Sequence, residues 1–271
     1  MSVKSSRLNQ RFPKVLSVTS FAAFQVDLIF GSEVLATGTA FFSSVGKRTL
    51  LLTNKHNVTG RNTETGECLD KKHAAIPNLM SVLIPITKAH GEGFICSHWQ
   101  RYNIPIYIDG DLGKPAWIEH PDYLIDLVGF KFSPPEVNLK NLVLPADGAD
   151  LPMQLCSRVN VIGYPFGVST DNFPLWSAGY IASEPAIDIN GKPLMYIDSR
   201  TRKGQSGSPV VRFFHPGEMV TVDGNSYMAK APQVYLLGIY SGRVHPESDI
   251  GMVWKKKAIL ELFEAAEKNE I

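Results

Sequence analysis

The sequence predicts an all-β protein, built as a barrel or a sandwich, that ends in one α-helix. Three observations lead to this prediction. Short apolar or alternating runs recur along the chain and are separated by turn residues. The second half of the chain shows the same pattern of short runs and turns as the first half. Residues 256–268 then place Ile259, Leu262 and Phe263 at helical spacing, which predicts a terminal amphipathic helix.

Strands of the first half are expected where the side chains alternate or where short apolar runs end at turns. Residues 24–30 come close to period two, with Phe24, Val26 and Leu28 on one face. Further strands are expected at residues 34–42, 49–52, 80–84, 94–96, 104–108 and 124–132. Two prolines at 134 and 135 then end the pattern, so residues 133–150 are expected to form a connector.

The second half contains a comparable set of strands. Asn190-Gly191 is the strongest short hairpin signal in the chain, because both residues tolerate the positive φ that a tight hairpin turn needs. Strands are expected at residues 158–162, 176–183, 187–189, 194–197, 210–214, 234–241 and 251–254.

Charge and composition narrow the classes of partner. The 271 residues are 44% hydrophobic and 20% charged, which is typical of a globular protein. Lys plus Arg (27) nearly balances Asp plus Glu (26), and the net charge is +1. Such a balance provides no general field for nucleic acid or an anionic membrane surface. No apolar run approaches the length of a membrane span, so neither nucleic acid nor membrane is expected as a partner.

Cysteine usage favours a reducing compartment. The three cysteines, Cys68, Cys96 and Cys156, are odd in number and widely spaced, which argues against a disulfide scaffold. Residues 15–24 are interrupted by hydroxyl side chains and make a poor signal-peptide core. We therefore expect a cytoplasmic protein in preference to a periplasmic or secreted one.

One hexapeptide, Gly204-Gln205-Ser206-Gly207-Ser208-Pro209, has the composition of a nucleophile-bearing turn. A glycine near each side of Ser206 permits a sharp turn that a Cβ would obstruct. Such a turn can expose the hydroxyl and direct nearby N–H groups toward the oxyanion that the serine would create. The alternative is a glycine-rich hairpin without chemistry.

A nucleophilic serine needs a base and a carboxylate that orients the base. Of the seven histidines, His56 follows directly on an apolar strand. Asp126 interrupts an apolar run, where an unpaired carboxylate would cost several kcal/mol. A histidine N–H would compensate this cost. The alternatives are a histidine without chemistry and an aspartate in a salt bridge or strand cap, with Asp122 as a more exposed rival.

Metal binding is a third possibility. Four zinc-competent side chains lie between His56 and Asp126, in the long polar interval that we call the insertion: Cys68, His73, Cys96 and His98. Their spacing fits no standard structural zinc pattern. No metal and no other cofactor is therefore expected.

The order of these motifs resembles the chymotrypsin/trypsin-like serine proteases. Three motifs follow the His, Asp, Ser order of that family: Thr53-Asn54-Lys55-His56, Asp126-Leu127-Val128 and the hexapeptide around Ser206. Gly38-Thr39-Ala40-Phe41-Phe42 resembles the strand that precedes the family's histidine.

Two further segments resemble the bacterial branch that includes the high-temperature-requirement proteases. They are Val161-Ile162-Gly163-Tyr164-Pro165-Phe166-Gly167 and Ser177-Ala178-Gly179-Tyr180-Ile181. The match extends over residues 24–265. It implies two six-stranded antiparallel Greek-key β-barrels with a C-terminal α-helix. It divides the chain into five segments: a lead-in (1–22), an N-terminal barrel (23–132), a connector (133–150), a C-terminal barrel (151–254) and a helix (255–271).

The resemblance also implies roles in catalysis. Ser206 would be the nucleophile, His56 the general base, and Asp126 the group that holds the imidazole tautomer. The N–H groups of Gly204 and Ser206 would form the oxyanion hole. The expected function is a serine endopeptidase that cleaves protein or peptide substrates through an acyl-enzyme. The alternative is a catalytically inactive peptide-binding module of the same fold.

A substrate pocket is implied by the same resemblance. Ser241 would sit behind Asp126, Gly242 and Arg243 would edge the pocket, and Gly251 would line its far wall. Arg200 would lie at the base of the pocket, which would then be basic and prefer an acidic or polar side chain before the cut. The alternative is that both arginines point into solvent. Oligomeric state and regulatory partners stay open.

Two departures from the family pattern are informative. Gln205 replaces the aspartate that, in the digestive enzymes, receives a new N-terminal amine after zymogen cleavage, so cleavage of this type is not expected. Asn57 stands where secreted members carry a cysteine, so the usual disulfide beside the histidine is not expected.

Overall fold

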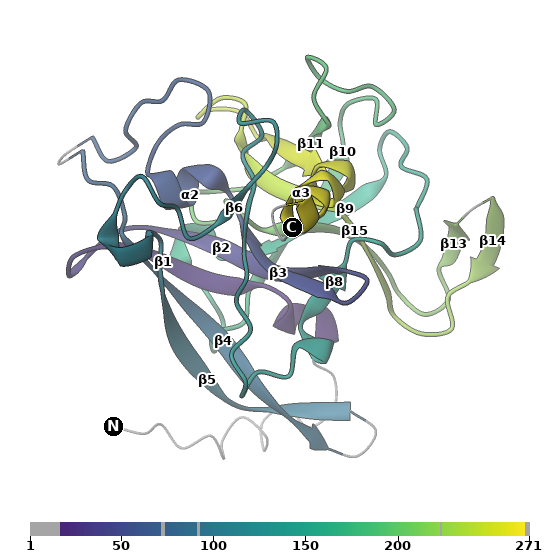
Figure 1. The fold of residues 1–271 in the computed structure, drawn as a ribbon. Helices are drawn as coiled ribbons and strands as arrows, with labels where there is room; N and C mark the ends of the chain where they lie inside the picture. The colour runs from purple at the N-terminus through teal and green to yellow at the C-terminus, as the bar shows by residue number, and fades with distance from the viewer. Residues whose placement is uncertain (1–16, 72–73, 91–92, 223, 269–271) are drawn as a thin grey trace.

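The computed structural model describes residues 17–71, 74–90, 93–222 and 224–268. Two β units lie side by side, and a C-terminal helix packs against both (Figure 1). The helix α3, Lys256–Lys268, has the predicted extent. Most of the predicted lead-in at 1–22 falls outside the described residues. The remaining helices are short: η1 Val18–Phe21, α2 Lys55–Thr59, η2 Ile108–Gly110, η3 Leu139–Asn141 and η4 Pro165–Gly167.

The N-terminal unit is a strongly coiled sheet. Its strand order is β5-β4-β1-β2-β3-β7-β6, and β8 pairs with β2 in parallel. The described part of this sheet therefore has eight strands where six were predicted, and one pair is not antiparallel. The strands are β1 Phe24–Phe30, β2 Glu33–Val45, β3 Arg48–Thr53, β4 Leu79–His90, β5 Gly93–Pro105, β6 Ile118–Glu119, β7 Val128–Phe130 and β8 Val143–Pro145.

The C-terminal unit is a closed barrel of six antiparallel strands, in the order β10-β11-β16-β15-β12-β9. This confirms the predicted mostly-β, two-unit fold class. A separate hairpin of β13 and β14 projects from the unit (Figure 1). The strands are β9 Arg158–Gly163, β10 Leu175–Ile181, β11 Leu194–Ser199, β12 Pro209–Phe214, β13 Met219–Val222, β14 Asn225–Met228, β15 Gln233–Arg243 and β16 Ile250–Lys255.

Each unit buries its own core, and α3 closes the seam between the two. Phe24, Val26 and Leu28 of β1 point inward, as the alternation predicted. On α3, Ile259, Leu262 and Phe263 are buried in one cluster with side chains from both units. Because burial of apolar area stabilises by about 25 cal/mol per Å², this shared cluster holds the two units in a fixed relation.

Several sequence-based expectations need correction. Residues 124–132 were expected to form one strand, but β7 covers Val128–Phe130 alone, because a turn closed by the Ile125 N–H on the Asp122 carbonyl precedes it. Residues 94–96 and 104–108 were expected as separate strands, yet the first and the start of the second belong to one long strand, β5. The Asn190-Gly191 turn is confirmed, with φ values of 53° and 71°.

The connector at 133–150 contains β8 and η3. The boundaries of the five predicted segments stay a prediction. Among the described residues, no helix combines the length and the apolar character needed to cross a membrane.

Candidate active site

His56 and Asp126 are brought together by the pairing of β3 with β7. Thr53 pairs with Val128, so the residues just beyond β3 lie beside those just before β7. Asn54 fixes this junction, because its side-chain amide donates to the Asp126 carbonyl at 2.7 Å. His56 is the second residue of α2, and its ring is directed at the Asp126 carboxylate.

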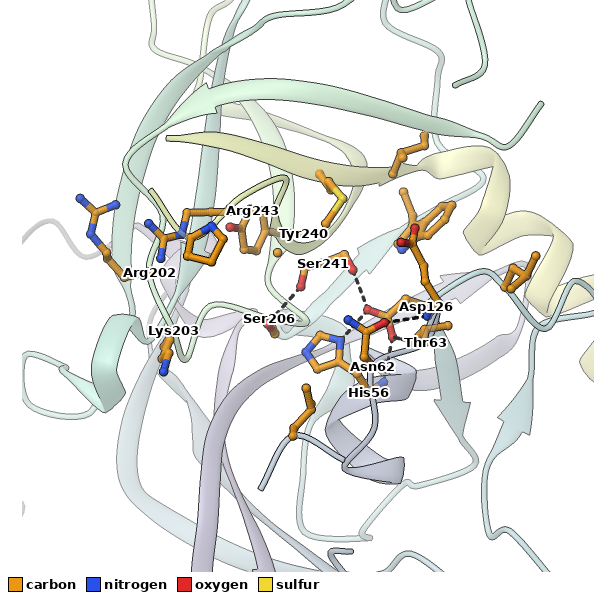
Figure 2. A pocket seen from close by; sticks show the side chains of 18 residues that line it. His56, Asn62, Thr63, Asp126, Arg202, Lys203, Ser206, Tyr240, Ser241 and Arg243 are labelled. Carbon is orange, nitrogen blue, oxygen red and sulfur yellow. Dashed lines mark hydrogen bonds and ion pairs between the residues drawn. The ribbon is translucent and has the colours of Figure 1, made fainter. Parts of the chain in front are cut away.

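Asp126 is buried and accepts hydrogen bonds from three residues (Figure 2). The His56 N–H lies 2.8 Å from Oδ1, and His56 Nδ1 lies 2.6 Å from Oδ2. The Thr63 hydroxyl donates to Oδ1 at 2.9 Å, and the Ser241 hydroxyl donates to Oδ2 at 2.6 Å. A buried carboxylate is stabilised as an anion only when it is satisfied in this way.

The two groups shift each other's pKa in the direction that a proton relay needs. Burial alone would raise the pKa of Asp126, but the charge of His56 and the donated hydrogen bonds lower it overall. Burial alone would lower the pKa of His56, but the Asp126 carboxylate raises it above its ordinary value of 6.5. An ionised Asp126 cannot donate, so Nδ1 carries the proton and Nε2 of the neutral ring is free to accept one.

Ser206 lies in a turn that requires glycine on both sides. Gly204 and Gly207 have φ values of +93° and +86°. A Cβ on Gly204 would lie 2.3 Å from the Tyr164 carbonyl oxygen, and one on Gly207 would lie 2.1 Å from the Thr39 carbonyl oxygen. The hexapeptide is therefore a tight turn packed against neighbouring backbone, as predicted.

Thr39 of β2 connects this turn to the N-terminal unit. Its N–H donates to the Ser206 carbonyl at 2.8 Å, and its hydroxyl donates to the Gly204 carbonyl at 2.9 Å. The Asn57 side-chain amide adds a donor to the Ser206 carbonyl at 3.2 Å. These bonds hold a loop of the second unit beside the histidine of the first.

The N–H groups of Gly204 and Ser206 make no hydrogen bond to any described residue. The Lys203 carbonyl accepts from the Phe166 N–H at 2.6 Å. In a trans peptide the N–H points opposite to the carbonyl, so the Gly204 N–H is directed away from Phe166. Both amides are available to an anionic group.

The Ser206 hydroxyl donates to the Ser241 carbonyl at 3.1 Å, and no hydrogen bond joins it to His56 in the described structure. Ser241 is the extra residue of a bulge in β15, since Tyr240 and Gly242 pair with consecutive residues of β16. A bulge turns a residue out of the regular pattern, which leaves Ser241 free to contact both Ser206 and Asp126. His56, Asp126 and Ser206 line one cavity of about 430 Å³ (Figure 2).

Among known proteins, the similarity of this chain lies in its structure and not in its sequence. Neither the protein-family models nor the curated protein sequences gave a significant match. Among solved structures, the serine endoprotease from Yersinia pestis superposes with a TM-score of 0.52 at 14% identity, over 97% of this chain and 66% of that chain. The active form of the Rv3671c protease from M. tuberculosis aligns with a TM-score of 0.47 at 16% identity, over 91% and 81% of the two chains.

The chain has the trypsin-like serine protease fold. At this level of identity the similarity shows the fold alone. Only some of the residues predicted for the substrate pocket line the cavity. Ser241, Gly242 and Arg243 line the cavity, whereas Arg200 and Gly251 do not.

The space beside Gly251 is occupied by a neighbouring ring. A Cβ on Gly251 would lie 2.7 Å from Cε2 of Tyr240, whose side chain is buried. The Tyr240 hydroxyl lies 2.5 Å from the hydroxyl of Thr201, which is also buried. Tyr240 therefore fills the place that the trypsin-like resemblance assigns to a pocket, and Gly251 supports its ring.

Arg200 is exposed and does not line the cavity, whereas its neighbours Arg202 and Lys203 do. Arg202 donates to the Asp249 carboxylate at 2.8 Å. This hydrogen bond and the nearby charges of Arg200 and Arg243 hold the pKa of Asp249 below its ordinary value.

Gln205 braces the turn from inside. It is fully buried; its side-chain carbonyl accepts from the Arg202 N–H at 2.8 Å, and its amide donates to the Ser177 hydroxyl at 2.9 Å. Gln205, which stands where the digestive enzymes have an aspartate, thus bonds to two neutral groups of the chain, the Arg202 N–H and the Ser177 hydroxyl.

The zinc-competent residues do not assemble in the described structure. The Cys96 thiol donates to the His98 carbonyl at 3.4 Å, and burial raises its pKa to about 11. His73 lies outside the described residues. Within residues 17–268 as described, no group of three metal-ligating side chains occurs. All three cysteines are free thiols.

Proposed function

We propose that the chain is a serine endopeptidase that acts through an acyl-enzyme. One observation carries the proposal: the bonded His56–Asp126 pair and Ser206 line one cavity, and the Gly204 and Ser206 amides in the turn of Ser206 are unpaired within the described residues. Each group has the chemistry that acyl transfer requires, namely a base, a nucleophile and donors for the oxyanion.

The proposed reaction begins when Ser206 Oγ attacks the substrate carbonyl carbon and His56 Nε2 takes the hydroxyl proton. The charge that develops on the carbonyl oxygen is stabilised by the Gly204 and Ser206 N–H groups. His56 returns the proton to the leaving amine, and the C–N bond breaks. Water, deprotonated by His56, then hydrolyses the acyl-enzyme. Asp126 stabilises the imidazolium in each step.

Ser206 must first leave the Ser241 carbonyl. This neutral hydrogen bond is worth about 0.5–1.5 kcal/mol net, which is small beside the barrier to peptide hydrolysis. A rotation of the serine side chain toward Nε2 is therefore an inexpensive step that substrate binding can drive.

The second candidate is an inactive peptide-binding module. The bond from Ser206 Oγ to the Ser241 carbonyl, in place of one to His56, is the observation that favours it. On this alternative the cavity binds an extended peptide, and no covalent intermediate forms.

A fluorophosphonate probe distinguishes the two functions. We expect the purified chain to be labelled, Ser206→Ala not to be labelled, and Ser208→Ala to be labelled like the parent. Ser208 is a suitable control because it lies in the same turn but is fully buried and does not line the cavity. Mass spectrometry of a digested peptide mixture then tests for cleavage of peptide bonds. An unlabelled parent chain that leaves the peptides intact supports the binding module.

Protein or peptide substrates are the proposed partners. The cytoplasmic location stays a prediction from the cysteine usage and the N-terminal sequence.

A further inference from the structure

Three cationic side chains line the cavity on the side of Ser206 away from Asp126. Arg202, Lys203 and Arg243 lie together in this part of the site, and the Asp126 carboxylate lies across Ser206 from them (Figure 2). We name Arg202, Lys203 and Arg243 the cationic wall.

The charge of this wall is only partly compensated. Arg202 pairs with Asp249, but neither Lys203 nor Arg243 forms an ion pair with any described residue. Two carboxylates, Asp126 and Glu64, also line the cavity; the charge of Asp126 is engaged by His56, and Glu64 is exposed. The chain as a whole carries a net charge of only +1, so the wall is a local concentration and not a general property of the surface.

The depth of the site determines where this charge acts. Tyr240, hydrogen-bonded to Thr201 and packed on Gly251, fills the interior next to Ser206. A substrate side chain at this place cannot penetrate to the barrel core and stays near the cavity mouth. There its end lies within the field of Lys203 and Arg243.

The remaining cavity wall has a different chemistry. Six of its residues are apolar, namely Leu69, Leu124, Leu194, Pro246, Met252 and Trp254, and three are polar, namely Asn62, Thr63 and Glu64. Apolar side chains that line a concave site bind apolar groups. The cavity thus offers a ligand two kinds of contact, one cationic and one apolar.

We propose that the cavity selects peptides that carry a carboxylate side chain at or next to the scissile carbonyl and an apolar side chain a few residues away. Cleavage at this carbonyl rests on the proposed function, but the binding preference does not require catalysis. The preference comes from Lys203 and Arg243. Of the two arginines that the sequence predicted for a basic pocket, Arg243 lines the cavity and Arg200 does not.

The test uses the Ser206→Ala chain, so that binding is measured without turnover. Fluorescein-labelled nonapeptides of alanine and serine carry a central leucine and, at one of the four positions on either side, a single Glu, Gln or Lys. Dissociation constants are measured by fluorescence anisotropy. At the best position we expect the Glu peptide to bind about three- to tenfold more tightly than the Gln peptide, since exposed ion pairs contribute modestly. The Lys peptide should bind most weakly.

Charge reversal identifies the residues responsible. Adding Lys203→Glu or Arg243→Glu to the Ser206→Ala chain should reverse the Glu-to-Lys ratio of affinities. Lys230→Glu, the same charge change at an exposed lysine that does not line the cavity, should leave this ratio as it is. The Glu preference should also weaken between 50 mM and 500 mM salt, because exposed charges are screened.

Failure of the proposal is distinguishable from failure of the proposed function. Equal binding of the Glu, Gln and Lys peptides, or an unchanged ratio in both reversed variants, would overturn the cationic preference even if the parent chain reacts with fluorophosphonate. An unreactive parent chain whose Ser206→Ala variant still prefers Glu would retain the preference and remove the peptidase.

Discussion

The two sides of the candidate site differ in how completely their polar groups are satisfied. On the base side, Asp126 accepts from the backbone and ring of His56, from Thr63 and from Ser241. On the nucleophile side, the amides of Gly204 and Ser206 are unpaired within the described residues, and the Ser206 hydroxyl contacts only a carbonyl. The base is thus assembled in advance, whereas the oxyanion donors are held ready for a ligand.

The proposed function accounts for this difference. A buried carboxylate without donors would take up a proton, so the base side must be complete before substrate arrives. Donors for a transient oxyanion must remain unpaired and be held rigidly, because they act at the moment when charge develops. Thr39 provides that rigidity by fixing the carbonyl groups of Gly204 and Ser206, while it leaves their N–H groups free.

The strongest test of the comparison removes the charge on the base side. In Asp126→Asn the side-chain amide would donate to His56 Nδ1, so the ring would carry its proton on Nε2 and could not act as a base. We expect kcat/KM to fall by about 10⁴-fold, with the fold retained. Steady-state kinetics on a peptide substrate and the thermal melting curve measure both.

Retention of more than a tenth of the parent kcat/KM by Asp126→Asn would mean that the preassembled pair is structural. A melting temperature that fell steeply in the same variant would attribute the loss to unfolding, because the buried network would then be required for stability.

These central residues could be predicted because each breaks a local pattern. His56 ends an apolar strand, Asp126 interrupts an apolar run, and Ser206 lies between glycines. Each feature is costly unless compensated, and compensation by one another is the simplest solution. Strand β1 followed from alternation, since a strand with one buried face alternates, whereas β3 followed from a short apolar run.

The second prediction disturbs the nucleophile side. In Gly204→Ala a Cβ would lie 2.3 Å from the Tyr164 carbonyl oxygen at a φ of +93°. The turn must shift, and the amide donor moves with it. We expect kcat/KM to fall by about 10²- to 10³-fold, which is the usual effect of losing one oxyanion donor.

Gly191→Ala is the matched control for this prediction. Its φ is +71°, but nothing lies within 4 Å of its Cβ position, and it belongs to a hairpin outside the cavity. Similar losses of activity in the two variants would show that backbone strain, and not the position of the amide, causes the effect.

Other parts of the site could not be predicted from the sequence. Thr63 is one threonine in a long polar insertion without periodicity, and its approach to Asp126 depends on how that loop folds back. The position of Tyr240 depends on the bulge at Ser241, because alternation alone does not reveal an extra residue in β15. The resemblance to the trypsin-like family therefore implied a pocket beside Gly251 where the structure places the ring of Tyr240.

The smallest expected effect concerns Thr63, which completes the base side from the insertion. In Thr63→Val the carboxylate loses the donor at 2.9 Å from Oδ1. We expect kcat/KM near neutral pH to fall by about three- to tenfold, which corresponds to about 0.6–1.4 kcal/mol, the net contribution of one ordinary hydrogen bond. Thr63→Ser should restore it. Thr65→Val should have no effect, because its hydroxyl accepts from the Glu67 N–H in the same loop.

The pH profile separates positioning from a general structural defect. His56 must be neutral to act as a base, and Asp126 raises its pKa, so kcat/KM should rise with pH through a midpoint above 6.5. Loss of the Thr63 donor concentrates the negative charge of Asp126, which favours the imidazolium further. The midpoint should therefore move to higher pH in Thr63→Val and return in Thr63→Ser. An unmoved or lowered midpoint, with activity reduced equally at every pH, would place Thr63 outside the proton relay and make the insertion a passive cover over the base.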